Sequence, residues 1–192
     1  MTTPRYTALF FVLFGQIFSC LAQSPSAEKI QWLSLELAMD KYASEKKPII
    51  LDMYTDWCGF CKKLDAETFS DPRIIRYINN NFYAVKFDAE SSKPVKYQDT
   101  IYTNTRIGSL DENGKPSRSK SHSLAEKLLN GRMAYPTIVY LVPEKDIVAP
   151  VPGYVTPEGI EPYLLFFADK VYEGNLFDAY TKGMKSTPII TP

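Results

Sequence analysis

Residues 49–61 read Ile49-Ile50-Leu51-Asp52-Met53-Tyr54-Thr55-Asp56-Trp57-Cys58-Gly59-Phe60-Cys61, and they contain the strongest structural signal in the chain. The first six are an almost continuous apolar run, which is typical of a short strand buried on both faces of a sheet. Two cysteines three positions apart follow, and residues 62–67 continue as a predicted helix. The sequence therefore places Cys58 and Cys61 between a buried strand and the start of a helix.

That position has a specific chemical use. A helix N-terminus stabilises a thiolate, because its free N–H groups and the positive end of its dipole face the sulfur. A thiol with a pKa of about 8.5 is only about 3% ionised at pH 7, whereas a pKa of about 7 leaves about half of it ionised. We therefore expect Cys58 to be the exposed nucleophile and Cys61, almost one turn further on, to resolve the mixed disulfide.

Two other uses of the cysteine pair remain open at this point. A zinc site would need four ligands, and the only other soft candidate is His122, the single histidine of the chain. A purely structural disulfide is also possible, although it would close a very small loop and add little stability. We expect no metal site.

The first residues are different in kind from the rest. Arg5 precedes an apolar run over residues 7–18, and small residues follow at Ser19, Cys20 and Ala22. This pattern predicts a secretory signal peptide over residues 1–22, and hence export to the periplasm or beyond. Two alternatives are an anchoring helix that is never cleaved and a lipoprotein lipidated at Cys20. Cleavage after Ala22 would leave Cys58 and Cys61 as the only cysteines, and one close pair indicates chemistry rather than a disulfide scaffold.

Composition and charge narrow the function classes. Apolar residues make up 45% of the chain, so it can bury a sizeable core. The 22 Lys and Arg residues balance the 22 Asp and Glu residues, which argues against a nucleic-acid partner. The length suits one domain after an export signal.

The remaining elements follow from periodicity and capping signals. We expect helices over residues 28–46, from Pro72 to about Asn79 with Asp71 as N-cap, from a capping box at Ser123 to Gly131, and from about residue 156 onward. Strands are predicted at 82–88, 137–142 and 147–151. The order of helix, strand, helix and strand in the first half implies two parallel strands joined by a crossover, and so an α/β fold.

Residues 90–121 interrupt this alternation of helices and strands. They are polar and show no sustained periodicity, so we read them as an insertion after the second core strand. Because parallel strands end at one edge of a sheet, the insertion should emerge beside the cysteines. We hypothesise that it helps to select a protein partner; the alternative is a tolerated surface loop.

The segment 50–62 resembles the active-site segment of the thioredoxin superfamily. Residues 67–72, Glu-Thr-Phe-Ser-Asp-Pro, resemble the exported branch that is related to the periplasmic end domain of transmembrane disulfide reductases. Residues 135–137 are similar to the family's cis-proline loop, and residues 152–154 to its late glycine turn. The resemblance covers about residues 30–173 apart from the insertion. It implies a thioredoxin fold over residues 23–183, with a mixed sheet of four to five strands flanked by helices, and a tail at 184–192.

The family's residue roles carry over at matching positions. The resemblance implies that Asp52 is a buried acid that assists proton transfer to Cys61, that Lys86 lies near this acid, and that a cis bond precedes Pro136. The implied substrate-binding residues are Trp57, Gly59, Phe60, Tyr135 and Pro136. Phe60 departs from the family, because thioredoxin has proline there and strong oxidants often have histidine. For His122, a surface or capping position is expected rather than catalysis.

These observations predict an extracytoplasmic thiol–disulfide oxidoreductase that acts on proteins, as a reductant because Phe60 cannot stabilise a thiolate electrostatically. It would need no cofactor beyond the Cys58–Cys61 disulfide. A membrane protein could recycle it, and we expect a monomer. The competing class is a binding or assembly module that keeps the fold with an idle cysteine pair.

Overall fold

The computed structural model describes residues 28–105, 108–110, 113–115, 120–174 and 190. The predicted signal peptide at 1–22, Cys20 and nearly all of the predicted tail at 184–192 lie outside these residues. Within the described part of the chain, no helix is both long enough and apolar enough to cross a bilayer.

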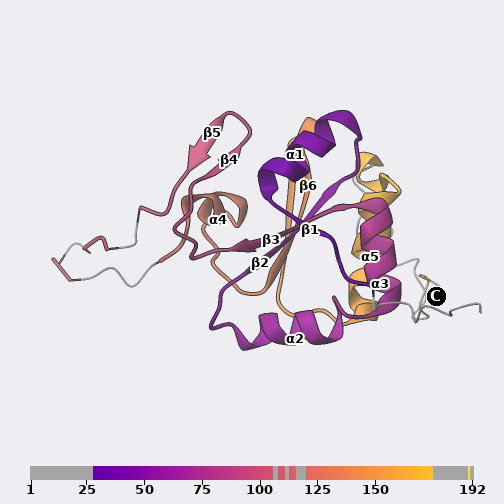
Figure 1. Ribbon diagram of the computed structural model, residues 1–192, viewed down its shortest axis with the longest axis horizontal. Coiled ribbons are helices and arrows are strands. Elements are labelled where there is room, and N and C mark those ends of the chain that lie inside the picture. The colour runs from indigo at the N-terminus through magenta and orange to yellow at the C-terminus, as the bar shows by residue number, and fades with distance from the viewer. Residues whose placement is uncertain (1–27, 106–107, 111–112, 116–119, 175–189, 191–192) are drawn as a thin grey trace, which may run out of the picture.

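Five strands form one mixed sheet in the order β1-β3-β2-β6-β7 (Figure 1). The strands β1 and β2 run parallel to β3, whereas β6 runs antiparallel to β2 and β7 antiparallel to β6. Their bounds are β1 (Trp32–Leu33), β2 (Ile49–Tyr54), β3 (Tyr83–Asp88), β6 (Thr137–Val142) and β7 (Ile147–Pro152). The predicted α/β class with a central mixed sheet is confirmed.

Helices pack on both faces of this sheet. In Figure 1, α3 and α5 lie side by side on one side of the sheet, and α1 and α4 lie on the other. The α-helices are α1 (Leu35–Ser44), α2 (Gly59–Glu67), α3 (Pro72–Asn81), α4 (Ser123–Leu128) and α5 (Pro157–Ala168). The described residues also contain two 3₁₀ turns, η1 (Pro143–Lys145) and η2 (Val171–Gly174). The central strands β2 and β6 are buried along nearly their whole lengths, as apolar runs between two helical layers should be.

The first helix is shorter than its periodicity predicted. It begins at Leu35 rather than at residue 28, because Ser34 caps it by accepting a hydrogen bond from the Leu37 N–H at 3.2 Å. Trp32 and Leu33 form strand β1 instead, paired with β3. The Trp32 ring packs edge-on against Phe69, at 5.4 Å between centroids. The helix predicted over residues 28–46 is therefore observed only from Leu35 to Ser44, and Trp32 and Leu33 belong to an edge strand.

The insertion is more regular than expected. It contains a two-stranded antiparallel hairpin of β4 (Val95–Tyr97) and β5 (Thr100–Tyr102). Tyr97 is buried, and the Lys96 N–H donates to the Glu36 carboxylate of α1 at 3.1 Å. Strands of three residues are too short to show periodicity, which is why the sequence did not reveal them.

The predicted start of α4, a capping box with Ser123 as N-cap, is wrong by one residue. The N-cap of α4 is His122, whose Nδ1 accepts a hydrogen bond from the Leu124 N–H at 3.1 Å. By contrast, the predicted N-cap of α3 is confirmed: the Asp71 carboxylate accepts from the Arg73 N–H at 2.8 Å, and Pro72 opens the helix.

Candidate active site

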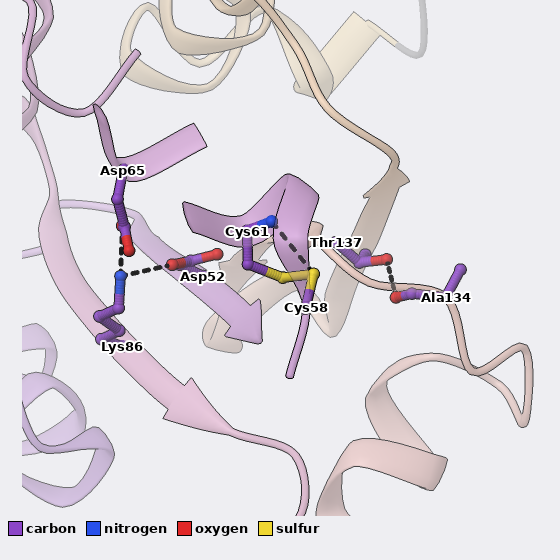
Figure 2. The surroundings of a disulfide bond; sticks show 7 residues. All are labelled: Asp52, Cys58, Cys61, Asp65, Lys86, Ala134 and Thr137. Carbon is purple, nitrogen blue, oxygen red and sulfur yellow. Dashed lines mark hydrogen bonds and ion pairs between the residues drawn. A yellow bond between two sulfur atoms is a disulfide. The ribbon is translucent and has the colours of Figure 1, made fainter. Parts of the chain in front are cut away.

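The cysteine pair lies where β2 gives way to α2. Cys58 is the N-cap of α2, and its Sγ accepts a hydrogen bond from the Cys61 N–H at 3.0 Å. The two cysteines form a disulfide with a Cα–Cα distance of 5.3 Å (Figure 2). A sulfur in this position faces the free N–H groups and the positive dipole end of the helix, as the cysteine spacing predicted.

Cys58 is less accessible than expected. It is 4% exposed and Cys61 is 3% exposed, because in this oxidised state the sulfurs are bonded to each other against the first turn of α2. The neighbouring side chains project outward instead: Trp57 is 66% exposed and Phe60 is 64% exposed. Gly59 has open space around the position of a missing Cβ.

A buried acid lies behind the disulfide. Asp52 is 1% exposed and stands opposite Lys86 in the ladder between β2 and β3. The Lys86 Nζ lies 3.1 Å from Asp52 Oδ2, and it also contacts the carboxylate of Asp65 on α2 (Figure 2). Sequence reasoning placed Asp52 and Lys86 together but missed Asp65. Its signal was its spacing, four residues after Cys61 and so on the same face of the helix.

Burial sets the protonation of these groups. Loss of hydration raises the pKa of Asp52 from 3.8 to about 6, although the positive charge of Lys86 opposes this rise. Burial alone would lower the pKa of Lys86, but the charges of Asp52 and Asp65 outweigh it, so that pKa is raised. The amine lies over the rings of Trp32 and Tyr54, at 5.3 and 5.1 Å from their centroids. Asp52 can therefore exchange a proton near neutral pH, while Lys86 stays charged.

The Tyr135–Pro136 loop forms the next wall of the site. The Tyr135–Pro136 peptide bond is cis, and the Thr137 hydroxyl donates to the Ala134 carbonyl at 2.7 Å beside the disulfide (Figure 2). The Gly153 N–H donates to the Pro136 carbonyl at 2.8 Å, so the late glycine turn holds this loop. The φ angle of Gly153 is +96°, a conformation that favours glycine. The Tyr135 ring meets Trp57 edge-on, at 6.0 Å between centroids.

His122 joins the two ends of the insertion. It is fully buried, so the expectation of a surface position is wrong, whereas the expected capping is confirmed. Its backbone N–H donates to the Ala89 carbonyl at 2.7 Å, and its Nε2 lies 3.1 Å from the Lys93 carbonyl. Since Nδ1 accepts from Leu124, Nε2 carries the proton and donates to Lys93. Burial lowers the pKa of His122, which favours this neutral form.

The structure thus brings most of the predicted residues to one end of the sheet. Cys58 and Cys61 are bonded to each other, Asp52 and Lys86 form an ion pair, and Lys86 contacts Asp65 on the helix that also carries Cys61. Trp57 and the Tyr135–Pro136 loop border the disulfide. Among the described residues, no group of three or more His, Cys, Asp or Glu side chains could hold a metal ion.

Comparison with known proteins gives the family context. A family model described as a thioredoxin-like domain matches residues 35–168. The thiol:disulfide interchange protein DsbD of Vibrio vulnificus (strain CMCP6) is 44% identical over 45 residues, which cover 23% of this chain and 7% of the relative. DsbD of Salmonella typhimurium is 40% identical over 55 residues, which cover 28% of this chain and 10% of the relative. The matched segments therefore span a tenth or less of these curated relatives.

A solved structure similar to this chain is the reduced C-terminal domain of DsbD from Neisseria meningitidis. It shares 20% identity, with a TM-score of 0.39, and the match covers 78% of this chain and 94% of that domain.

Proposed function

Because this chain belongs to the family of thioredoxin-like domains, we propose that it is an exported thiol–disulfide oxidoreductase that acts on proteins through Cys58 and Cys61. The observation that carries the proposal is the sulfur of Cys58 at the N-terminus of α2, bonded to Cys61 and backed by the buried Asp52. A buried acid with a pKa raised to about 6 near a cysteine pair is typical of a functional site, which supports the proposal.

The reaction transfers two electrons from the protein to its substrate. In the reduced protein, the Cys58 thiolate attacks one sulfur of a substrate disulfide, and the other substrate sulfur leaves as a thiolate. The Cys61 thiol then loses its proton and attacks Cys58 Sγ. This second step forms the Cys58–Cys61 disulfide and releases the second substrate thiolate. The substrate disulfide is reduced to two thiols, and the protein reaches the oxidised state seen here.

Asp52 is the proposed base for the second step. Its ionised form accepts the Cys61 proton, and its protonated form returns that proton when the disulfide is reduced again. A carboxyl with a pKa of about 6 is better matched to a thiol than an ordinary aspartate is. Lys86 stays positively charged beside Asp52 and limits the cost of ionising it in a buried place.

The proposed direction is reduction of the substrate. Phe60 lies between the cysteines and cannot stabilise a Cys58 thiolate by charge, unlike a histidine at that place. Without such a charge the thiolate of the reduced form is stabilised less, which keeps the reduction potential low. A low potential suits a protein that passes electrons to substrates.

The proposed location is outside the cytoplasm, with residues 1–22 as a cleaved signal and residues 23–183 as the thioredoxin-like domain. Some relatives are named thiol:disulfide interchange proteins, which supports a dithiol partner, and we propose that a membrane protein supplies the electrons. The redox group is the protein's own disulfide. Intact-mass analysis of the exported protein tests the N-terminus. A chain that begins at Gln23 supports cleavage after Ala22, and a lipid mass on Cys20 refutes it.

The reduction potential of the Cys58–Cys61 pair is the deciding measurement. We expect a reversible two-electron couple between about −270 and −200 mV on equilibration with a dithiol buffer. A value above about −150 mV would make the protein an oxidant. Cys58→Ser should abolish exchange, whereas Cys61→Ser should accumulate mixed disulfides with substrate. If no couple titrates and both variants behave alike, the chain is a binding module with an idle pair.

A further inference from the structure

The loop that leads into β6 has some backbone groups in use and others free. The Ala134 carbonyl accepts a hydrogen bond from the Thr137 hydroxyl at 2.7 Å, and the Pro136 carbonyl accepts one from the Gly153 N–H at 2.8 Å. Within the residues that the structure describes, the backbone N–H and C=O of Tyr135 have no hydrogen-bond partner. Tyr135 is also partly exposed. Its free backbone groups are therefore available to an extended polypeptide that pairs with the loop in strand-like fashion.

Tyr135 lies close to the reacting sulfurs. Its ring meets Trp57 edge-on at 6.0 Å between centroids, and Trp57 directly precedes Cys58. Figure 2 shows Ala134 and Thr137, which flank the loop, beside the disulfide. Successive residues of an extended chain are about 3.3 Å apart, so a polypeptide whose disulfide reaches Cys58 would carry its neighbouring residues past Tyr135.

The Thr137 hydroxyl sets the direction of the free Tyr135 N–H. Ala134 and Tyr135 share a trans peptide unit, and because that unit is planar its C=O and N–H point in opposite directions. The hydroxyl holds the Ala134 C=O towards Thr137, so the Tyr135 N–H points away from Thr137. Rotation of the peptide unit would turn this N–H and break the hydrogen bond at the same time. One side-chain hydrogen bond therefore orients the donor that a substrate strand would use.

Thr137 is itself fixed in the central sheet. It is 1% exposed and is the first residue of β6. Its neighbours in the sheet are Met53 of β2 on one side and Pro152 of β7 on the other. The hydroxyl is thus attached to a buried strand and not to a second loop. It positions the Tyr135 N–H before a substrate arrives, which lowers the entropy lost on binding.

We propose that Thr137 is a positioning residue for polypeptide substrates. Its hydroxyl holds the backbone of Tyr135 in the direction that pairs with the segment around the substrate cysteine. This inference rests on the proposed function and adds a residue to it. It distinguishes two kinds of substrate: a polypeptide disulfide gains from the oriented backbone, whereas a small disulfide without peptide groups meets only the sulfurs.

The test compares two disulfides as substrates of the reduced protein. One is the symmetric disulfide of an uncharged pentapeptide with cysteine at its centre, and the other is hydroxyethyl disulfide. The second-order rate constant of each reduction is measured for the wild-type protein and for Thr137→Val, which removes the hydroxyl and nearly keeps the side-chain shape. We expect the peptide rate constant to fall about 5-fold, since one hydrogen bond changes an equilibrium by about 2- to 10-fold. The rate constant for hydroxyethyl disulfide should not change, and Thr137→Ser, which keeps the hydroxyl, should restore the peptide rate.

Thr68→Val is the matched control. Thr68 is also buried, and its hydroxyl donates to the Val155 carbonyl at 2.6 Å, at the end of α2 away from the cysteines. Loss of this hydroxyl should lower the stability in urea, as Thr137→Val does, and leave the ratio of the two rate constants unchanged. The reduction potential should be the same in all of these proteins, because the cysteines and the N-terminus of α2 are intact.

A rate ratio that is unchanged in Thr137→Val, or that falls equally in Thr68→Val, would overturn the inference while leaving the oxidoreductase function intact. If Thr137→Val does not fold, Thr137→Ala removes the same hydroxyl and provides the same comparison. If the wild-type protein reduces neither disulfide, the proposed function itself fails.

Discussion

The substitution Asp52→Asn should stabilise the protein, and the gain should depend on pH. The pKa of Asp52 is about 6 in the folded chain and close to its ordinary value of 3.8 in the unfolded chain. The folded state therefore binds more protons than the unfolded state between these values, so the free energy of unfolding falls as the pH rises through them. A difference of about two pH units corresponds to about 3 kcal/mol. Asparagine resembles the protonated acid and avoids this loss.

Urea denaturation of the oxidised protein at about pH 4 and about pH 8 measures the effect. The disulfide is kept closed so that thiol titration does not contribute. We expect near-equal stabilities at the acidic pH and a gain of about 2 to 3 kcal/mol for the variant at the basic pH. Asp40→Asn, on the exposed side of α1, should change stability by less than about 0.5 kcal/mol at both. An Asp52→Asn gain that is the same at both pH values, or a loss at both, would refute the reasoning.

Three further substitutions test other contacts. Lys86→Met removes the cation 3.1 Å from Asp52, a charge that lowers the pKa of that carboxyl. In the variant the pKa of Asp52 should rise, and with it the pH at which substrate reduction is half-maximal. Phe60→His places a charged donor beside Cys58 and should raise the reduction potential measured against a dithiol buffer. Arg73→Met removes the guanidinium 3.2 Å from Glu161, whose side chain is 3% exposed, and should cost about 3 kcal/mol in urea denaturation. A loss below about 1 kcal/mol would show that this ion pair is dispensable.

Much of this site could be predicted because its signals are local. The apolar run of β2, the Asp71 cap and the cysteine spacing each lie within a few residues of one another, so the sequence displays them directly. The pairing of Asp52 with Lys86 is not local. It was implied only by resemblance, and the register of β2 with β3 accounts for it.

Features that depend on distant partners could not be predicted. Strand β1 has two residues and exists only because β3 offers a free edge. The hairpin of the insertion depends on Glu36 of α1 and on the burial of Tyr97. His122 follows a polar stretch, which predicted a surface position. It is buried because it forms hydrogen bonds with the carbonyls of Ala89 and Lys93. In each case the decisive partner lies far away in the chain, in another element or at the other end of the insertion.

The balance of charges around Lys86 explains why the pKa of Asp52 suits its proposed role as the base that accepts the Cys61 proton. One ammonium group, that of Lys86, contacts two carboxylates, those of Asp52 and Asp65. A one-to-one pair would hold Asp52 ionised to lower pH and make it a weaker base. The additional negative charge of Asp65 opposes ionisation of Asp52 and so helps to keep its pKa near 6. A buried aspartate with no cation would be protonated well above neutrality and could not accept the Cys61 proton. The shared lysine therefore keeps the pKa of Asp52 between these two extremes. Ionising Asp52 still lowers the stability of the folded protein, and the gain expected for Asp52→Asn measures that loss.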